Sequence, residues 1–299
     1  MRLHEALPGA TRRRVVGAAL ALVAVYLVRA GSSPRPEPVT ADVVSPVSSS
    51  APRACARDRV LVTAHRGTGP GTRLVSGREY AENTLPAFHS ALDAGADGVE
   101  ADWWPTSDGQ VVAHHDPTLE RMTGSRGRID QHTWAEVAAA RVRGGARMAR
   151  FGEVVAAVRG RGAHRQQELK DASVFSTRAL EQMVRTDLDG DPDAYGRVLY
   201  TSSRMSTLRR LHTLDVRLSL GLITRSATGR PVLARLPSWL DVVHIDLRAA
   251  DRAYVRAAVE HGFAVSVRGV DTVAQLHRAA DLGATRVLTN RAEVLGRAC

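Results

Sequence analysis

Polar side chains that could do chemistry follow several short apolar runs of this sequence. His65 and Arg66 come directly after one such run, and Glu100 and Asp102 stand two residues apart at the end of another. Residues i and i+2 of a strand point to one face, so both carboxylates would project into the same space. Such a pair repels unless a cation or a shared proton neutralises it, and hard divalent metals prefer oxygen ligands. The pair therefore predicts a metal site, with a solvated acidic edge as the alternative.

Two further segments carry the same residue types. "AHHDP" places His115 and Asp116 after apolar residues, and "QELKD" holds Glu168 and Lys170, again two apart. Neighbours in a strand point to opposite faces, so His114 and His115 cannot both face the site easily. Three carboxylates and two histidines at successive strand ends are hard to explain as packing alone.

The elements that must position these residues alternate between short apolar runs and longer amphipathic stretches. Repeated strand–helix units imply a parallel sheet, and roughly eight units in about 240 residues suit a (β/α)8 TIM barrel of the α/β class. An open doubly wound sheet is the alternative, although no glycine-rich phosphate loop follows the first strand. The expected strands are 60–64, 97–102, 110–114, 166–169, 197–201, 216–220, 241–246, 263–267 and 285–289, and the expected helices include 84–94, 175–188, 204–213, 251–261 and 272–281.

Composition narrows the classes of partner. The 299 residues carry 41 Lys+Arg against 31 Asp+Glu, a net charge of +10, yet Lys170 is the single lysine. So complete a preference for arginine indicates a compositional bias, and aromatic residues make up only 4% of the chain, which leaves little for stacking on bases. We therefore expect no nucleic-acid partner. The spare positive charge suits anionic substrates or contact with an anionic cell surface.

The N-terminal segment has the layout of an export signal. Three arginines at 12–14 precede an apolar run over 15–28 and a small residue at Ala30, and the triple arginine resembles a twin-arginine signal. The alternative is an uncleaved N-terminal anchor, for which the run is short. Residues 31–54 are rich in Pro and Ser and predict a flexible linker. The sequence thus predicts a secreted or extracytoplasmic protein, anchored to the cell surface if the leader is uncleaved.

The two cysteines, Cys55 and Cys299, bracket the expected domain over 55–299. In an exported protein an even pair is more often bridged than free, so a disulfide is expected, with two unrelated thiols as the alternative. A bridge would require the two chain ends to meet, which a closed barrel allows.

The polar residues occur in an order that resembles the glycerophosphodiester phosphodiesterase family over about residues 60–295. Each piece is short, but the ordered set is specific. The matching pieces are His65-Arg66-Gly67, Glu82-Asn83-Thr84, Glu100-x-Asp102, Asp108-Gly109, His115-Asp116, Leu119-x-Arg121-x-Thr123 and Glu168-Leu169-Lys170.

This resemblance implies a TIM barrel with a small insertion after the second strand, here about 116–150. It also implies one divalent cation, Ca²⁺ or Mg²⁺, held by Glu100, Asp102 and Glu168, and catalysis by His65 and His115. A phosphodiester is anionic, so cations must neutralise its phosphoryl oxygens, and Arg66 and Lys170 suit that task. Glu82 is interpreted as a supporting carboxylate that faces the site, with helix capping as the alternative.

The implied activity is hydrolysis of a small glycerophosphodiester to an alcohol and glycerol 3-phosphate by a monomeric enzyme, with two-histidine acid–base catalysis. The alternatives are a phospholipase D-like enzyme that acts on intact lipids and a non-catalytic binder of anionic glycerol polymers.

The chain departs from the family pattern mainly in its second half. Arginine stands at 204 and 268, where a pocket aromatic is expected, and Asn290 stands where the family tends to have aspartate. These departures leave the metal carboxylates and the histidines in place, so they bear on the preference for the leaving alcohol.

Overall fold

The computed structural model of the protein describes residues 60–191, 193–224 and 230–298. The expected export signal, the linker and both cysteines lie outside these residues. Among the described residues, no helix has both the length and the apolar character needed to cross a bilayer.

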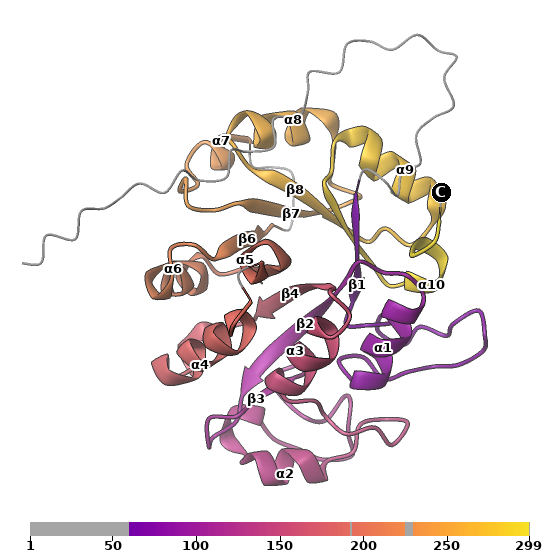
Figure 1. Ribbon diagram of the computed structural model, residues 1–299, viewed down its shortest axis with the longest axis vertical. Helices are drawn as coiled ribbons and strands as arrows, with labels where there is room; N and C mark the ends of the chain where they lie inside the picture. The colour runs from indigo at the N-terminus through magenta and orange to yellow at the C-terminus, as the bar shows by residue number, and fades with distance from the viewer. Residues whose placement is uncertain (1–59, 192, 225–229, 299) are drawn as a thin grey trace, which may run out of the picture. The chain divides into compact units, whose positions relative to one another are not determined.

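Eight parallel strands close into a barrel, because β1 pairs with both β2 and β9. This closure confirms the predicted (β/α)8 fold and shows that the open-sheet alternative is wrong. In Figure 1 the strands lie at the centre and the helices surround them. The strands are β1 (Leu61–His65), β2 (Gly98–Pro105), β3 (Val111–Ala113), β4 (His164–Leu169), β5 (Val198–Ser202), β6 (Ser219–Ile223), β7 (Val242–Asp246), β8 (Ala264–Arg268) and β9 (Arg286–Thr289).

Each barrel strand is followed by at least one helix on the outside of the barrel. The α-helices are α1 (Leu85–Asp93), α2 (Trp134–Ala139), α3 (Phe151–Arg159), α4 (Thr177–Leu188), α5 (Ala194–Arg197), α6 (Met205–Leu214), α7 (Arg230–Leu233), α8 (Arg252–Glu260), α9 (Val273–Leu282) and α10 (Ala292–Leu295). Two short 3-10 helices, η2 (Ile129–Gln131) and η3 (Ala172–Val174), lie in loops.

Side chains point alternately to the two faces of each strand, which separates the apolar core under the helices from the polar interior of the barrel. In β2, Val99, Ala101 and Trp103 belong to the apolar cluster packed against the helices, whereas Glu100 and Asp102 are buried on the other face. The apolar residues therefore fix the strand register, and that register sends both carboxylates inward.

The predicted first residue of each strand lies within two residues of the observed one, with one exception. The run 216–220 was expected as a strand, but β6 begins three residues later, at Ser219. The reason is a turn in which Asp215 accepts hydrogen bonds from the backbone N–H and the guanidinium of Arg217, which leaves Val216 71% exposed. Five helices were not among those named from the sequence: α2, α3, α5, α7 and α10.

The segment between β3 and α3 forms the insertion after the second barrel strand. β3 pairs antiparallel with β2, outside the closed barrel, so it returns the chain to the edge where β2 ends. A second, smaller apolar cluster fixes the segment to this hairpin; it comprises Trp104, Val112, Leu119, Met122, Ile129, Val137, Ala140, Val142 and Met148.

Candidate active site

A cavity of about 750 Å³ opens at the carboxyl ends of the barrel strands. His65, Arg66, His115, Glu168 and Lys170 line it. This is the end of a TIM barrel at which the loops gather and active sites lie. A second hollow, of about 680 Å³, lies along α4 on the outside of the barrel and contains none of the predicted site residues.

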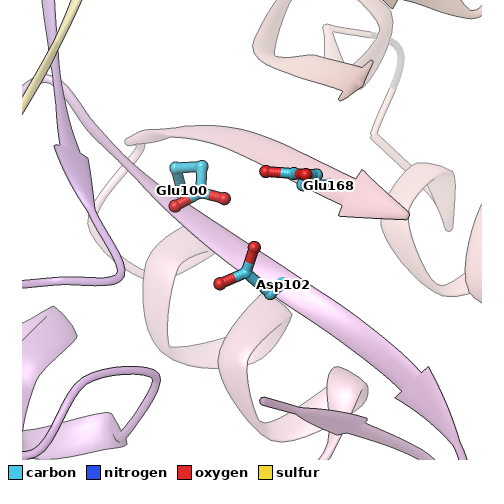
Figure 2. A group of neighbouring side chains, drawn as sticks. All are labelled: Glu100, Asp102 and Glu168. Carbon is cyan, nitrogen blue, oxygen red and sulfur yellow. The ribbon is translucent and has the colours of Figure 1, made fainter. Parts of the chain in front are cut away.

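The three predicted metal carboxylates come from two adjacent strands. Glu100 and Asp102 lie on β2, and the pairing of β2 with β4 sets Asp102 directly opposite Glu168. One carboxylate oxygen from each residue lies within 4.8 Å of the others. Figure 2 shows the three carboxyl groups gathered around a common space beside the strands.

Burial and mutual repulsion shift the pKa values of these three carboxyl groups. Burial, together with the carboxylates of Asp102 and Glu168, raises the pKa of Glu100 well above its usual range. Burial and Asp102 also raise the pKa of Glu168. For Asp102, burial raises the pKa, but the cations of Lys170 and Arg66 outweigh it, so the pKa of Asp102 is lowered.

The donor set fits a hard divalent cation. Glu100 Oε1 is buried and has no hydrogen-bond partner among the described residues. An unpaired buried carboxylate oxygen is costly, and a cation placed among the three carboxylates would remove that cost. Oxygen ligands alone suit Ca²⁺ or Mg²⁺.

Lys170 and Arg66 lie against the same carboxylates. Lys170 Nζ is 2.8 Å from Asp102 Oδ1 and 2.6 Å from Glu168 Oε1. The backbone N–H of Arg66 donates to Glu100 Oε2 at 3.0 Å, and its Nε lies 3.1 Å from Asp102 Oδ2. Burial lowers the pKa of Lys170, but the carboxylates of Asp102, Glu168 and Glu100 outweigh it and raise the pKa overall. The Lys170 ammonium therefore stays charged beside the three carboxylates.

A strained turn holds Arg66 in place. Arg66 has φ +52° and Asn83 has φ +58°, and Asn83 N–H donates to the carbonyl of Arg66 at 3.0 Å. A left-handed residue other than glycine costs about 1–2 kcal/mol, and such strain gathers at functional sites. At the adjoining Gly67, a Cβ would lie 2.7 Å from the backbone of Ala87, so only glycine fits against α1.

Glu82 does not line the cavity. It is 4% exposed, and its Oε1 accepts hydrogen bonds from Arg66 Nη1 at 3.0 Å and Arg121 Nη2 at 2.6 Å. Thr84, not Glu82, is the residue that precedes α1, so helix capping does not explain this carboxylate. The structure thus places Glu82 where it orients Arg66.

His65 is held by a polar chain that crosses from β1 to the loop after β9. Its Nδ1 lies 2.7 Å from Asn290 Oδ1. The amide Nδ2 of Asn290 donates to Asp271 Oδ2 at 3.0 Å, so the oxygen of the amide must face the histidine. Nδ1 of His65 therefore carries the proton, and Nε2, 4.0 Å from Glu100 Oε2, faces the carboxylates. Burial and Arg66 lower the pKa of His65 to about 4.

His115 and His114 have different surroundings. The His115 side chain is 33% exposed and lines the cavity, and its Nδ1 lies 2.6 Å from Asp116 Oδ1. His114 is 2% exposed, and its Nδ1 lies 2.8 Å from the carbonyl of Asp116. Burial lowers the pKa of both histidines, and for His115 the carboxylate of Asp102 opposes that effect. The structure therefore brings His115, and not His114, to the site.

Three supporting residues escaped sequence reasoning. Asn83 grips Asp102 twice, because its Nδ2 donates to Asp102 Oδ2 at 2.9 Å and its Oδ1 accepts from Asp102 N at 3.2 Å. Asn290 and Asp271 orient His65 across 225 and 206 positions of sequence. Two signals pointed to Asn290: it follows a strand as the other site residues do, and it stands where the family pattern tends to have aspartate.

Comparisons with known proteins agree with this geometry. A model of the glycerophosphoryl diester phosphodiesterase family matches residues 65–294. A glycerophosphodiester phosphodiesterase of Bacillus subtilis is 24% identical over 271 residues, which cover 83% of this chain and 89% of the relative. A glycerophosphodiester phosphodiesterase from Caldanaerobacter subterraneus is 38% identical over 79 residues. This match covers only 26% of this chain and 29% of the relative.

A solved structure supports the fold. The phosphodiesterase of Oleispira antarctica, determined with the product sn-glycerol-3-phosphate, superposes with a TM-score of 0.63 at 19% identity, covering 80% of this chain and 96% of that one. The family match extends over well more than half of the 299 residues. The chain described here therefore belongs to the glycerophosphoryl diester phosphodiesterase family.

Proposed function

We propose that this protein is a metal-dependent enzyme that hydrolyses glycerophosphodiesters to an alcohol and glycerol 3-phosphate. The observation that carries the proposal is the convergence of Glu100, Asp102 and Glu168 with two histidines at the end of the barrel where active sites lie. Phosphodiester hydrolysis needs charge neutralisation at phosphorus together with a proton acceptor and a proton donor. The three carboxylates would hold the cation that neutralises this charge, and the two histidines can serve as proton acceptor and proton donor.

Glu100, Asp102 and Glu168 would hold the cation. When bound, Ca²⁺ or Mg²⁺ would supply charge stabilisation to the phosphoryl oxygens. The carboxylates engage Lys170 and Arg66 at the same time. The Lys170 and Arg66 side chains thus stand beside the space in which a phosphate next to the cation would lie, and their positive charges would face its phosphoryl oxygens.

His65 suits the role of general base. Its Nδ1 proton is committed to Asn290, so Nε2 carries the free lone pair. Because burial and Arg66 lower its pKa to about 4, the imidazole is neutral near pH 7. It can therefore take a proton from an attacking hydroxyl, while the new P–O bond forms on phosphorus.

His115 suits the role of general acid. Its Nδ1 lies against a carboxylate, which stabilises the imidazolium, whereas His65 lies against a neutral amide. Asp116 is itself held by Arg121, whose Nε donates to its second oxygen. His115 would deliver its proton to the oxygen of the leaving alcohol as the P–O bond to that oxygen breaks. The proton taken by His65 and the proton given by His115 balance over one turnover.

The exposed apolar side chains bear on the lipid alternative. The large apolar side chains that are exposed in the described part of the chain are Val75, Val216, Val232, Val259 and Val273, each on a different segment. A lipid surface is usually met by a contiguous apolar patch. We therefore propose a water-soluble diester as the substrate.

A substrate screen with the purified full chain tests this proposal. Water-soluble glycerophosphodiesters, intact phospholipids and a glycerol-phosphate polymer would be offered separately, with release of glycerol 3-phosphate measured for the diesters and of free alcohol or fatty-acyl product for the others. We expect turnover of the soluble diesters, and no turnover by the His65→Ala variant as the control for a contaminating enzyme. Turnover of intact lipids alone would overturn the proposed substrate class, and turnover of none would overturn the proposed function.

A further inference from the structure

The cavity has a second half that the chemistry described above does not use. The metal carboxylates and both histidines come from β1, β2, β4 and the segment after β3, on one side of the barrel mouth. The opposite side is built from the ends of β5 to β8. Two arginines stand there, Arg204 after β5 and Arg268 at the end of β8.

Arg268 has spare hydrogen-bond donors. Its nearest carboxylate is Asp246, at 3.7 Å from Nε to Oδ2, which is beyond hydrogen-bond distance. Asp246 also accepts the backbone N–H of Arg248 at 2.9 Å. A guanidinium carries five N–H donors, and no other described residue accepts from that of Arg268. The side chain is 35% exposed to the cavity mouth and can take an anionic ligand.

Arg204 is in a similar position. Its Nη2 lies 3.3 Å from Asp171 Oδ2, and the side chain is 58% exposed. The other oxygen of Asp171 caps η3, because it accepts the backbone N–H of Ser173 at 2.9 Å. A guanidinium carries five N–H donors, so Arg204 keeps donors beyond this one ion pair. Arg128, the third arginine of this rim, is different, since it already makes two hydrogen bonds to Asp130 at 2.9 and 2.8 Å. Among the described arginines of this rim, Arg204 and Arg268 therefore keep guanidinium donors that can bind a ligand in this half of the cavity.

Among the described residues, the cavity wall has no aromatic cage for a cationic alcohol. Quaternary ammonium groups are bound by cages of aromatic faces. Among the described residues that line this cavity, Trp104 is the one residue of the Phe, Tyr or Trp type, and its indole N–H donates to the carbonyl of His115 on the metal side. Guanidinium groups instead favour planar or tetrahedral anions, which they bind with paired hydrogen bonds.

We propose that Arg204 and Arg268 form a second anion subsite, which selects glycerophosphodiesters whose leaving alcohol carries its own negative charge. The inference rests on the proposed function, since the scissile phosphate must lie beside the metal carboxylates for the alcohol to reach the opposite half. The ligand group is a phosphate or a carboxylate on the alcohol. It belongs either to a small molecule or to the next unit of a glycerol-phosphate chain.

Steady-state kinetics of the full chain would test the subsite. The substrates are glycerophosphoglycerol, whose leaving alcohol is neutral, its phosphorylated form, glycerophosphocholine, and a short glycerol-phosphate oligomer. We expect kcat/KM for the phosphorylated substrate to exceed that for the neutral one by about tenfold or more, the size of one charge-assisted hydrogen bond. The oligomer separates the two sources: a matching preference for it indicates a chain ligand, and a preference confined to the phosphorylated diester indicates a small one.

Charge removal should reduce this preference. In the double variant Arg204→Gln/Arg268→Gln, the ratio of kcat/KM between the phosphorylated and neutral substrates should approach one. The control Arg256→Gln, on the exposed side of α8, should keep the ratio of the unsubstituted protein. Added salt should lower the ratio in the unsubstituted protein as well, which needs no variant to fold.

Different outcomes overturn different statements. Equal kcat/KM for neutral and phosphorylated alcohols, or a preference that survives in the double variant, would overturn the anion subsite and leave the proposed function intact. Hydrolysis of none of the four substrates would overturn the proposed function and the subsite with it.

Discussion

His65 and His115 are the same residue type in one cavity, but their Nδ1 partners differ. A neutral amide accepts from His65, and a carboxylate accepts from His115. Burial lowers the pKa of both imidazoles, but only His115 has a carboxylate on Nδ1 that stabilises the imidazolium when it forms. At the residue scale, the proposed division of acid and base roles therefore rests on Asn290 and Asp116.

Substitution of the two adjacent histidines separates the catalytic side chain from its structural neighbour. His115→Ala should lower kcat by at least about 10²-fold, because it removes a general acid. His114→Ala should lower the melting temperature, since that side chain is 2% exposed, but the folded variant should keep most of its kcat. Steady-state kinetics and thermal unfolding of both variants check this. The reverse ranking would show that His114 faces the substrate.

The pH dependence of the reaction tests the role of Asn290. If His65 is the base, as we propose, its neutral form is the active one, and kcat/KM should fall as the pH drops through its pKa, which burial and Arg66 lower to about 4. A bound cation would lower this pKa further, which leaves the direction unchanged. Asn290→Asp places a negative charge beside the ring, favours the imidazolium and raises the pKa. The acidic limb of kcat/KM should therefore move to higher pH.

A charge control accompanies that measurement. Gln182→Glu adds a carboxylate on the outer surface of α4 and should leave the limb in place. An acidic limb that is the same in Asn290→Asp and in the unsubstituted protein would contradict the role of His65 as base.

At the scale of elements, a buried polar network joins α4 to the outer face of the barrel. Asp187 is fully buried and accepts hydrogen bonds from Arg165 Nε at 2.8 Å, Gln167 Nε2 at 3.0 Å and Tyr200 Oη at 2.8 Å. One carboxylate thus connects a helix with β4 and β5. The same strand β4 carries Glu168 on its inner face, so this network also fixes a metal carboxylate in place.

Loss of this carboxylate should be strongly destabilising. Asp187→Ala leaves Arg165 charged, buried and without its partner, which costs about 3–5 kcal/mol of the free energy of unfolding. Asp189→Ala, at an exposed position two residues away, should change it by less than about 0.5 kcal/mol. Urea denaturation of the two variants measures this difference in the free energy of unfolding. Equal midpoints would show that Asp187 contributes nothing to stability.

Sequence patterns predicted most of these elements because each depends on local periodicity. The i and i+2 spacing of Glu100 and Asp102 sufficed to place both on one face of β2, and the neighbouring strand supplied Glu168. The predicted start of β6 was wrong because a turn formed by the Asp215 side chain overrides the apolar pattern that begins at Val216. Asn290 was not predicted as a site residue because its role depends on closure of the barrel, which sets β9 beside β1.

At the scale of the whole molecule, the C-terminal part of the described barrel lies beside its first strand. The C-terminal segment packs against the turn between α1 and β2, where Arg297 Nη2 donates to the carbonyl of Asp93 at 2.8 Å. β1, near the start of the domain, lies beside β9. Cys55 and Cys299 lie outside the described residues, and we propose that they form a disulfide in an exported protein.

The proposed disulfide would close a loop that contains nearly the whole domain. In the chain-entropy model such a loop stabilises the folded state by about 5 kcal/mol. Cys299→Ser should therefore lower the melting temperature of the oxidised protein and leave its metal dependence intact, and a reducing agent should lower it in the unsubstituted protein alone. Two reactive thiols in the non-reduced exported protein would show that the bridge does not form.

The central claim is that the three carboxylates of Figure 2 hold a cation that the hydrolysis requires. Metal dependence of the hydrolysis tests this claim most directly. The measurement is release of glycerol 3-phosphate from a soluble glycerophosphodiester by the purified full chain, before and after treatment with EDTA. We expect chelation to abolish release, and Ca²⁺ or Mg²⁺ in excess of the chelator to restore it, but not in the Asp102→Asn variant. Full activity in the presence of EDTA would contradict the metal site and return Glu100, Asp102 and Glu168 to a purely structural role.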